Sequence, residues 1–259
     1  MPTAAALRFQ IERSLEARFP AALTPAPRAI AETVASGIAA VDELLGGGFP
    51  VGAISEIVGP ISSGRTSLAL ALLAGRTADG QVCAWVDAED TFDPESAAAT
   101  GVRLGQLLWV RCDKGSLGTS SGKRKQEKER TQLEQALSAT DLLLQTGGFA
   151  AIVLDLAGMD TSQGMRIPLA TWFRFRQAAN RTRCSLLVLG QASYAQSSAA
   201  VVLEAEPMHM DNMGGTVLHA AKFSISRRRQ QYAPHMAGAR KPPGSAWTAS
   251  TQWAMKQSA

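Results

Sequence analysis

The chain has few cysteines, and those it has form no pattern. Cys83, Cys112 and Cys184 are scattered along 259 residues, are odd in number and lack the close spacing of a zinc site. Two of them sit in apolar, strand-like runs, so we interpret all three as buried, reduced thiols. The sequence therefore argues against a disulfide framework and against a structural zinc site.

Long apolar runs are missing as well. No run reaches the length of a membrane span, and the first twenty residues carry charges where a signal peptide needs an uninterrupted apolar core. The apolar fraction, 46%, is that of an ordinary globular protein, and 259 residues suffice for one large α/β domain with short extensions. We therefore expect a cytoplasmic protein with no membrane partner.

Acidic residues are absent from the C-terminal end. None follows Asp211, so the last 48 residues carry a charge of +7 and the first 211 carry −3. A basic surface of this kind suits nucleic acid or an acidic protein. A solvated basic tail is the alternative, and composition leaves both open.

A glycine-bounded loop between a predicted strand and a predicted helix is the most informative feature. Ala53–Val58 predicts a buried strand, and a helix with apolar residues at helical spacing begins at Thr66. The loop between them follows the phosphate-binding pattern G-x-x-x-x-G-K-[ST], with arginine at the lysine position. The predicted phosphate-binding residues are Gly59, Pro60, Ile61, Ser62, Ser63, Gly64, Arg65, Thr66 and Ser67.

Each part of this loop has a physical role. Its glycines let successive amides turn toward a phosphate, and the helix N-terminus adds a partial positive charge. Thr66 offers a hydroxyl to Mg²⁺. Arg65 is not a conservative replacement for lysine, because guanidinium is wider, planar and differently hydrated. We expect phosphate affinity to survive this change better than fast hydrolysis does.

Other predicted strands end in polar side chains, at the edge where open α/β sheets bind ligands. Glu89 follows the strand Val82–Val86, and either orients water or is a solvated loop carboxylate. Asp155 ends an apolar run, where phosphate-loop ATPases carry a Mg²⁺-associated acid. Gln191 follows Ser185–Gly190 and either senses a γ-phosphate or is an ordinary strand-end amide.

The segments around this core differ in kind. Residues 1–27 predict an amphipathic helical arm and a proline-rich linker, and the arm docks either on its own domain or on a neighbouring subunit. We place the core domain at residues 28–232. Within it, Lys114–Arg130 is a charged insert that either contacts phosphate or is solvated. The pattern Thr131-x-x-Glu134 directly after it predicts a capping box that opens an amphipathic helix. Residues 233–259 predict a basic, flexible tail, and His209–Gly215 predicts a turn.

These motifs resemble the core of RecA-family recombinases. The stretches SGIAAVDELLGGGFPVGAISEIVGPISSGRTSLALALL and VCAWVDAEDTFDPE follow the RecA order of helix, glycine-rich turn, phosphate loop, strand and Asp-Ala-Glu motif, and AAIVLDLAG and LLVLGQAS come where that order requires. The resemblance implies an α/β, RecA-like P-loop NTPase core with a central, mainly parallel sheet flanked by helices. It also implies a catalytic carboxylate at Glu89, a Mg²⁺-associated acid at Asp155 and a nucleotide-sensing switch at Gln191.

Several departures argue against a complete recombinase. Arg65 replaces the lysine, and Ser96 stands about where the family stacks an aromatic ring on adenine. We find no clear match to the basic V-K-x-K segment, and we expect the family's folded C-terminal domain to be missing. The pattern is similar to the RecA-like accessory proteins named ImuA, also labelled SulA-like, of damage-inducible mutagenesis cassettes.

This resemblance implies an accessory protein of the DNA damage (SOS) response that supports error-prone translesion synthesis. The implied cofactors are ATP and Mg²⁺, with weak or absent hydrolysis. The implied partners are an ImuB-type Y-family polymerase-like protein, RecA, single-stranded DNA and, through the arm, a second copy. We expect Gln191 to relay occupancy to a loop at 192–215. Contacts with DNA or a partner are expected from Arg166, Arg227, Arg228 and Arg229.

Two alternatives from other classes stay open at the level of sequence. The first is an ATP-dependent, single-stranded-DNA-binding homologous recombinase, which the departures at Arg65 and Ser96 disfavour. The second is a purely structural partner protein whose phosphate loop is a relic.

Overall fold

The computed structural model describes residues 32–112, 131–213, 217–231 and 244–250. The chain divides into two compact units, Met1–Ile30 and Ala31–Ala259. The predicted arm and the charged insert Lys114–Arg130 lie outside the described residues, so those predictions stay untested.

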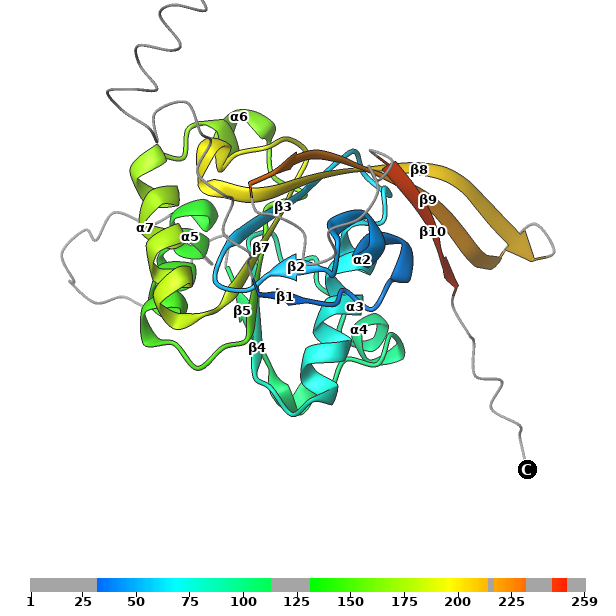
Figure 1. Ribbon diagram of the computed structural model, residues 1–259, viewed down its shortest axis with the longest axis horizontal. Coiled ribbons are helices and arrows are strands. Elements are labelled where there is room, and N and C mark those ends of the chain that lie inside the picture. The colour runs from blue at the N-terminus through cyan, green and yellow to red at the C-terminus, as the bar shows by residue number, and fades with distance from the viewer. Residues whose placement is uncertain (1–31, 113–130, 214–216, 232–243, 251–259) are drawn as a thin grey trace, which may run out of the picture. The chain divides into compact units, whose positions relative to one another are not determined.

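An eight-stranded sheet forms the centre of the second unit. Its strands can be followed by their labels in Figure 1. Its strand order is β10-β9-β8-β3-β7-β6-β4-β5. Six neighbouring strands run parallel, which confirms the predicted mainly parallel sheet; they are β8 (Ala199–Met213), β3 (Ile54–Val58), β7 (Ser185–Gly190), β6 (Ala151–Asp155), β4 (Cys83–Asp87) and β5 (Leu107–Arg111). β9 (Val217–Gln230) and β10 (Gly244–Ser250) extend the sheet with antiparallel pairs.

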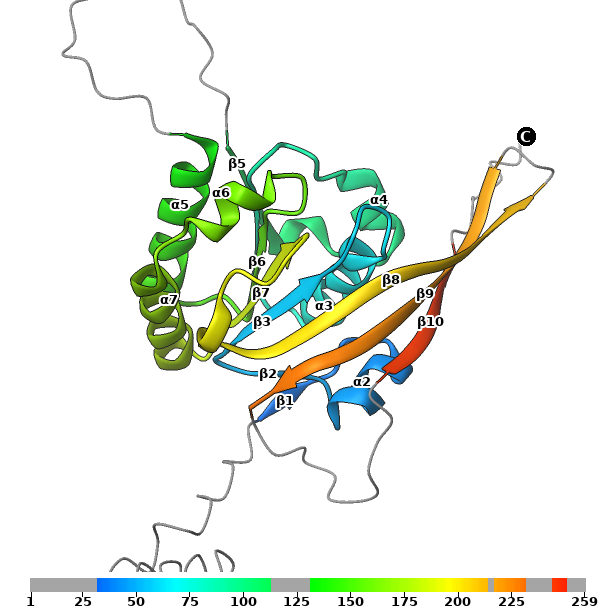
Figure 2. The ribbon, with the colours of Figure 1, turned by 90° about the horizontal axis from the view of Figure 1, so that it is seen from above.

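Helices cover both faces of the parallel strands (Figures 1 and 2). Apolar side chains of α2 (Ala39–Leu45), α3 (Arg65–Ala78) and α4 (Pro94–Ala99) join one buried cluster, and those of α5 (Gln132–Thr146) and α7 (Leu169–Thr182) join another. Side chains alternate across a strand, so Trp85 of β4 faces the first cluster and Ala84 the second. No helix in the described part is long and apolar enough to cross a membrane.

Short elements complete this unit. A small antiparallel pair, β1 (Thr33–Val34) and β2 (Phe49–Pro50), precedes the phosphate loop. The 3₁₀ turns η1 (Leu104–Gln106) and η2 (Gln196–Ser198) precede β5 and β8, and the short helix α6 (Thr161–Met165) follows β6.

The predicted start of α5 is confirmed at the level of single hydrogen bonds. The hydroxyl of Thr131 accepts from the amide of Glu134 at 3.2 Å, and the Glu134 carboxylate accepts from the amide of Thr131 at 2.9 Å. These two bonds are the reciprocal pair of a capping box. Both bonds lie within residues 131–134, so the local sequence itself favours this boundary.

The C-terminal strands correct two predictions from the sequence. A turn was expected at His209–Gly215 and a relay loop at 192–215, but β8 continues through Met213 because β9 pairs with its backbone along its length. A flexible tail was expected from residue 233, and this is wrong for Gly244–Ser250. That segment pairs with β9 and buries Trp247 against Phe223, with ring centroids 5.2 Å apart.

Candidate functional site

The predicted site residues gather at one edge of the sheet, where parallel strands end. Gly59 follows β3, Glu89 lies two residues after β4, Asp155 is the last residue of β6, and Gln191 follows β7. Parallel pairing aligns these strand ends, with Asp155 opposite Leu189 and Val58 opposite Gly190. The sheet therefore brings together residues that lie up to 132 positions apart in the sequence.

The phosphate loop is pressed onto the antiparallel extension of the sheet. Gly64 adopts a φ of 86°, and a Cβ built on it would lie 2.7 Å from the ring of Phe223 on β9. A Cβ on Gly59 would lie 2.1 Å from the carbonyl oxygen of Ala205 on β8. Real Cβ contacts are not this short, so both ends of the loop require glycine.

The interior of the loop holds donors without acceptors. The Ser63 side chain is fully buried, and its hydroxyl has no hydrogen-bond partner among the described residues. In the same part of the chain, the amides of Ser63, Gly64 and Arg65 donate to no other group. They precede or begin a 14-residue helix, α3, whose N-terminus favours an anion. Because buried polar groups are normally paired, this loop fits a phosphate group.

The side chain of Arg65 is hydrogen-bonded to the backbone at the end of β7. Its side chain is buried, with 6% of the residue exposed, and Nη1 donates to the carbonyl oxygen of Gly190 at 2.5 Å. Burial lowers the pKa of this guanidinium, and the nearby Asp155 and Tyr194 oppose that effect. The positive charge of Arg65 therefore lies at the end of β7, and its contact with a phosphate stays a prediction.

Asp155 is a buried carboxylate whose pKa is raised. Burial raises its pKa to about 6, and the neighbouring carboxylates Asp87 and Glu89 act in the same direction. A hydrogen bond from the amide of Ala157 at 3.0 Å and the charge of Arg65 oppose this rise. The carboxylate thus already accepts a hydrogen bond from an amide of its own chain.

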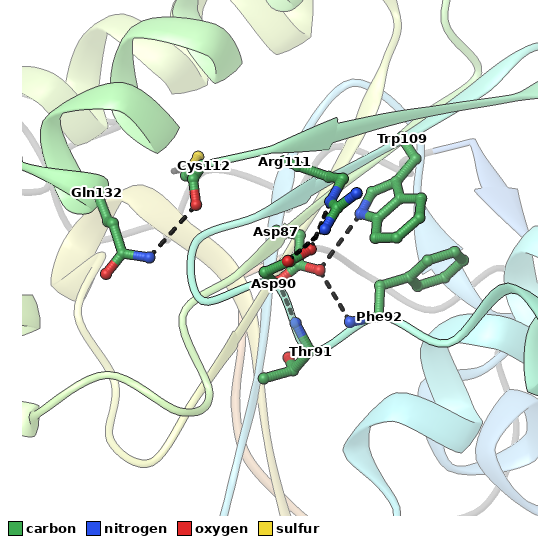
Figure 3. Close-up of polar contacts among 8 residues, drawn as sticks. All are labelled: Asp87, Asp90, Thr91, Phe92, Trp109, Arg111, Cys112 and Gln132. Carbon is green, nitrogen blue, oxygen red and sulfur yellow. Dashed lines mark hydrogen bonds and ion pairs between the residues drawn. The ribbon is translucent and has the colours of Figure 1, made fainter. Parts of the chain in front are cut away.

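Asp87 at the end of β4 serves the structure of the adjacent loop (Figure 3). Its carboxylate accepts from the amides of Thr91 at 3.0 Å and Phe92 at 2.8 Å, and from the indole of Trp109 at 3.3 Å. The two amide bonds hold the segment that carries Glu89, and the bond from Trp109 joins Asp87 to β5. The same segment is held to β5 by a bidentate ion pair, in which Arg111 donates to Asp90 at 2.6 and 2.5 Å.

A hydrogen bond also joins the residue after β5 to the helix α5. Figure 3 shows the Gln132 side-chain amide donating to the carbonyl oxygen of Cys112, at 3.3 Å. Gln132 is the first residue of α5, so this contact fixes where α5 starts relative to the strand end.

Glu89 and Gln191 both reach the loop that follows β6. A Cβ on Gly158 would lie 2.1 Å from Oε2 of Glu89, so the carboxylate rests against that glycine. The Gln191 side chain donates to the carbonyl oxygens of Ala157 at 3.2 Å and Met159 at 3.4 Å. Their predicted catalytic and sensing roles are not tested by these contacts, but the two side chains share one loop.

Glu56 belongs to the site, although the sequence analysis did not single it out. It lies within β3, is fully buried, and accepts from the amides of Tyr194 at 2.6 Å and Ala195 at 2.8 Å and from the Ser193 hydroxyl at 2.5 Å. Burial raises its pKa, and these three bonds oppose the rise. A charged residue inside an apolar strand was the signal that could have indicated this role.

The bonds to Glu56 fix the turn after β7. The bonds hold Tyr194 with its ring packed against Gly164 and Gly190. A Cβ on Gly164 would lie 2.5 Å from a carbon of that ring, and a Cβ on Gly190 would lie 2.6 Å from another. The Tyr194 hydroxyl is buried near Arg65 and has no hydrogen-bond partner within the described ranges. Together with the Ser63 hydroxyl, it is a buried side-chain hydroxyl without a partner in this part of the described chain.

The three consecutive arginines of β9 are each engaged within the chain. Arg227 donates to the carbonyl oxygen of Leu44 at 2.9 Å, Arg228 pairs with Glu204, and Arg229 donates to the carbonyl oxygen of Gln196. Their predicted contacts with DNA or a partner stay predictions.

Arg166 lies apart from those arginines in the fold. It is exposed at the C-terminal end of α6, and its own predicted contact with DNA or a partner also stays untested. Among the described residues, no three or more His, Cys, Asp or Glu side chains are arranged to hold a metal ion.

Comparison with known proteins agrees with this geometry. The family described as "RecA N-terminal domain" matches residues 5–121. Protein RecA of Rickettsia canadensis is 37% identical over 152 residues, 58% of this chain and 39% of that protein. Protein RecA of Nostoc punctiforme is 38% identical over 146 residues, 56% of this chain and 36% of that protein. The matched region spans less than two fifths of either relative.

A solved structure extends the comparison to most of the described fold. The crystal structure of the RadB recombinase superposes with a TM-score of 0.56 at 16% identity, covering 83% of this chain and 94% of that one. The fold is RecA-like. The sequence matches show similarity to proteins of the RecA family, and the RecA-like fold predicted from the sequence is confirmed.

We predict that Gly64→Ala destabilises this RecA-like core. The new methyl group meets the Phe223 ring, and the left-handed φ adds strain, for a loss on the order of 2–3 kcal/mol in the free energy of unfolding. Denaturant unfolding measures the loss. Gly75→Ala on the same helix is the control: nothing lies within 4 Å of its Cβ, so a gain of about 0.5–1 kcal/mol is expected. Equal stability of Gly64→Ala and wild type would contradict the packing described.

We predict opposite outcomes for two substitutions of Glu56. Glu56→Ala leaves two buried amides without an acceptor and a cavity, so it loses about 2–4 kcal/mol of stability. Glu56→Gln keeps an oxygen for both amides and a donor for Ser193, so it stays within about 1 kcal/mol of wild type. Denaturant unfolding at neutral pH compares the two variants. Equal losses in both would contradict the hydrogen-bonding role.

The raised pKa of Glu56 gives this comparison a pH dependence. The folded state holds the proton more tightly than the unfolded chain, so wild-type stability falls as pH rises above the ordinary value near 4.5 and through the raised folded value. Glutamine does not ionise. The stability of Glu56→Gln relative to wild type should therefore increase from acidic to neutral pH, and a decrease would contradict the assignment.

Proposed function

We propose that this chain is a RecA-like accessory protein of the DNA damage response, of the ImuA type, that binds nucleotide and hydrolyses it weakly or not at all. The phosphate cradle supports nucleotide binding, since Ser63 and the loop amides are unpaired within the described residues. The observation that carries the proposal is the buried guanidinium of Arg65, which is bonded to Gly190. A side chain held there is poorly placed to assist phosphoryl transfer in the way the usual lysine does.

The basic residues favour the same proposal. Arg227, Arg228 and Arg229 are occupied by acceptors of their own chain, which leaves them fewer donors for a DNA backbone or for a nucleotide of a neighbouring subunit. In this proposal the protein acts mainly through protein partners in error-prone translesion synthesis. We propose an ImuB-type Y-family polymerase-like protein and RecA as those partners, in the cytoplasm, by resemblance to the ImuA proteins.

An ATP-dependent recombinase that binds single-stranded DNA is the second candidate. It is favoured by the similarity to proteins named RecA and by the shared position of Glu89 and Gln191 at the loop after β6. In that case Glu89 would orient water, and Gln191 would report occupancy through its hydrogen bonds to that loop.

We predict that the purified protein turns over ATP slowly, and that single-stranded DNA does not stimulate it. Arg65→Lys should raise the rate, because a lysine ammonium is the group that the motif normally directs at the phosphates. A coupled phosphate-release assay with and without DNA measures both effects, and Arg76→Lys on the same helix controls for a general arginine-to-lysine effect. Strong DNA-stimulated turnover by wild type would overturn the accessory proposal and favour the recombinase.

A further inference from the structure

The outer side of α7 carries large apolar side chains that the core does not use. Of the nine large apolar side chains that are exposed in the described part of the chain, three lie within residues 165–173. Two of these belong to α7: Leu169, which is 52% exposed, and Phe173, which is 55% exposed. They lie four positions apart, so they are neighbours on the helix surface. Because exposed apolar side chains that cluster often mark an interaction site, this pair calls for a partner.

The charge around this apolar pair has one sign. Residues 161–183 contain five arginines and no acidic residue. Two of the five pair with Asp141 and Glu32 from other parts of the chain. Arg176 and Arg181 are exposed, and neither has a hydrogen-bond or ion-pair partner among the described residues. Positive charge is therefore left without a counter-charge beside the apolar pair.

Helical spacing places these side chains on one surface, which we call the α7 face: Leu169, Phe173, Arg176 and Arg181. Arg176 lies three positions after Phe173 and seven after Leu169, so it continues the same stripe of the helix. The buried side of α7 instead packs into the cluster that it shares with α5. Figure 2 shows α7 beside α5 at the periphery of the sheet. The α7 face thus joins an apolar centre to cationic ends, on the outside of the fold.

The chemistry of the α7 face favours one kind of occupant. A second copy in a two-fold dimer would set its arginines against the same arginines, which is repulsive. A nucleic-acid backbone would neutralise the arginines but offers no apolar surface for Leu169. A membrane surface would gain little from so few apolar side chains. A protein segment that carries both acidic and apolar side chains complements the whole face.

We propose that the α7 face docks an acidic, amphipathic segment of a partner protein. The apolar side chains of that segment pack on Leu169 and Phe173, and its carboxylates pair with Arg176 and Arg181. This inference rests on the part of the proposed function in which the chain acts through protein partners, and it assigns the surface and the chemistry of the partner. It is independent of nucleotide binding, since α3, which follows the phosphate loop, packs on the opposite face of the sheet.

Fluorescence anisotropy with the full chain tests this proposal. The probe is a labelled synthetic peptide as long as α7, with leucine and phenylalanine four positions apart and glutamate at most other positions. We expect micromolar binding that weakens as ionic strength rises. Phe173→Ala should weaken it by about tenfold or more, and Arg176→Ala by about threefold or more. Both side chains are exposed, so neither change should unfold the protein.

Matched controls remove the same kinds of side chain elsewhere on the surface. Leu104 and Arg103 are exposed at η1, so Leu104→Ala and Arg103→Ala should bind the peptide as wild type does. A second peptide, in which lysine replaces every glutamate, keeps the apolar side chains and reverses the charge. It should not bind.

Several results would overturn the docking surface. No binding of the acidic peptide to wild type, or equal losses in the α7 variants and the controls, would do so directly. A labelled single-stranded oligonucleotide that binds more tightly than the peptide, and that Phe173→Ala and Arg176→Ala weaken, would make the face a nucleic-acid surface. A wild-type dimer that Phe173→Ala dissociates in analytical ultracentrifugation would assign the face to a second copy.

The accessory role fails in a different measurement. Strong DNA-stimulated ATP turnover would overturn that role, whereas peptide binding reports only on the α7 face. The two failures are therefore distinguishable.

Discussion

The hydrogen bond from Arg65 to the carbonyl oxygen of Gly190 joins the two halves of the candidate site. Arg65 begins α3 directly after the phosphate loop, and Gly190 ends β7 directly before Gln191. The bond therefore couples the loop to the turn whose glutamine contacts the segment after β6. Because the guanidinium is buried, it needs compensating acceptors and charge, and Asp155 supplies the charge.

Other buried polar contacts hold the same turn from different sides. Glu56 accepts three hydrogen bonds from Ser193–Ala195, and Arg229 of β9 donates to Gln196. The segment between β7 and β8 is therefore tied to β3 and to β9. A turn held at this many points is a poor candidate for a freely moving relay loop. Any signal from the phosphate loop would have to pass through these contacts.

Local signals in the sequence predicted much of this arrangement. The capping box at Thr131, the apolar strand ending at Asp155 and the glycine spacing of the phosphate loop were all recognisable, because short-range hydrogen bonds and parallel strand ends produce them. The resemblance to RecA-family proteins added the order of the elements. That order and the mainly parallel sheet are what the structure confirms.

Long-range pairing was not predictable in the same way. Met213 and Gly244–Ser250 lie in segments rich in turn-forming and small residues, and they became strands because β9 pairs with both. Arg65 bonds to a residue 125 positions away, and Glu56 bonds to a turn 138 positions away. Contacts between residues so far apart produce no periodic pattern in the sequence. These contacts depend on the assembled sheet.

The central claim is that the buried guanidinium of Arg65 stays on the carbonyl oxygen of Gly190 when nucleotide is bound. A crystal structure of the chain grown with ATP tests it directly. The account predicts phosphate density in the loop with Nη1 of Arg65 still on Gly190. Phosphate density in the loop with Arg65 turned away from Gly190 and onto the phosphates would contradict it.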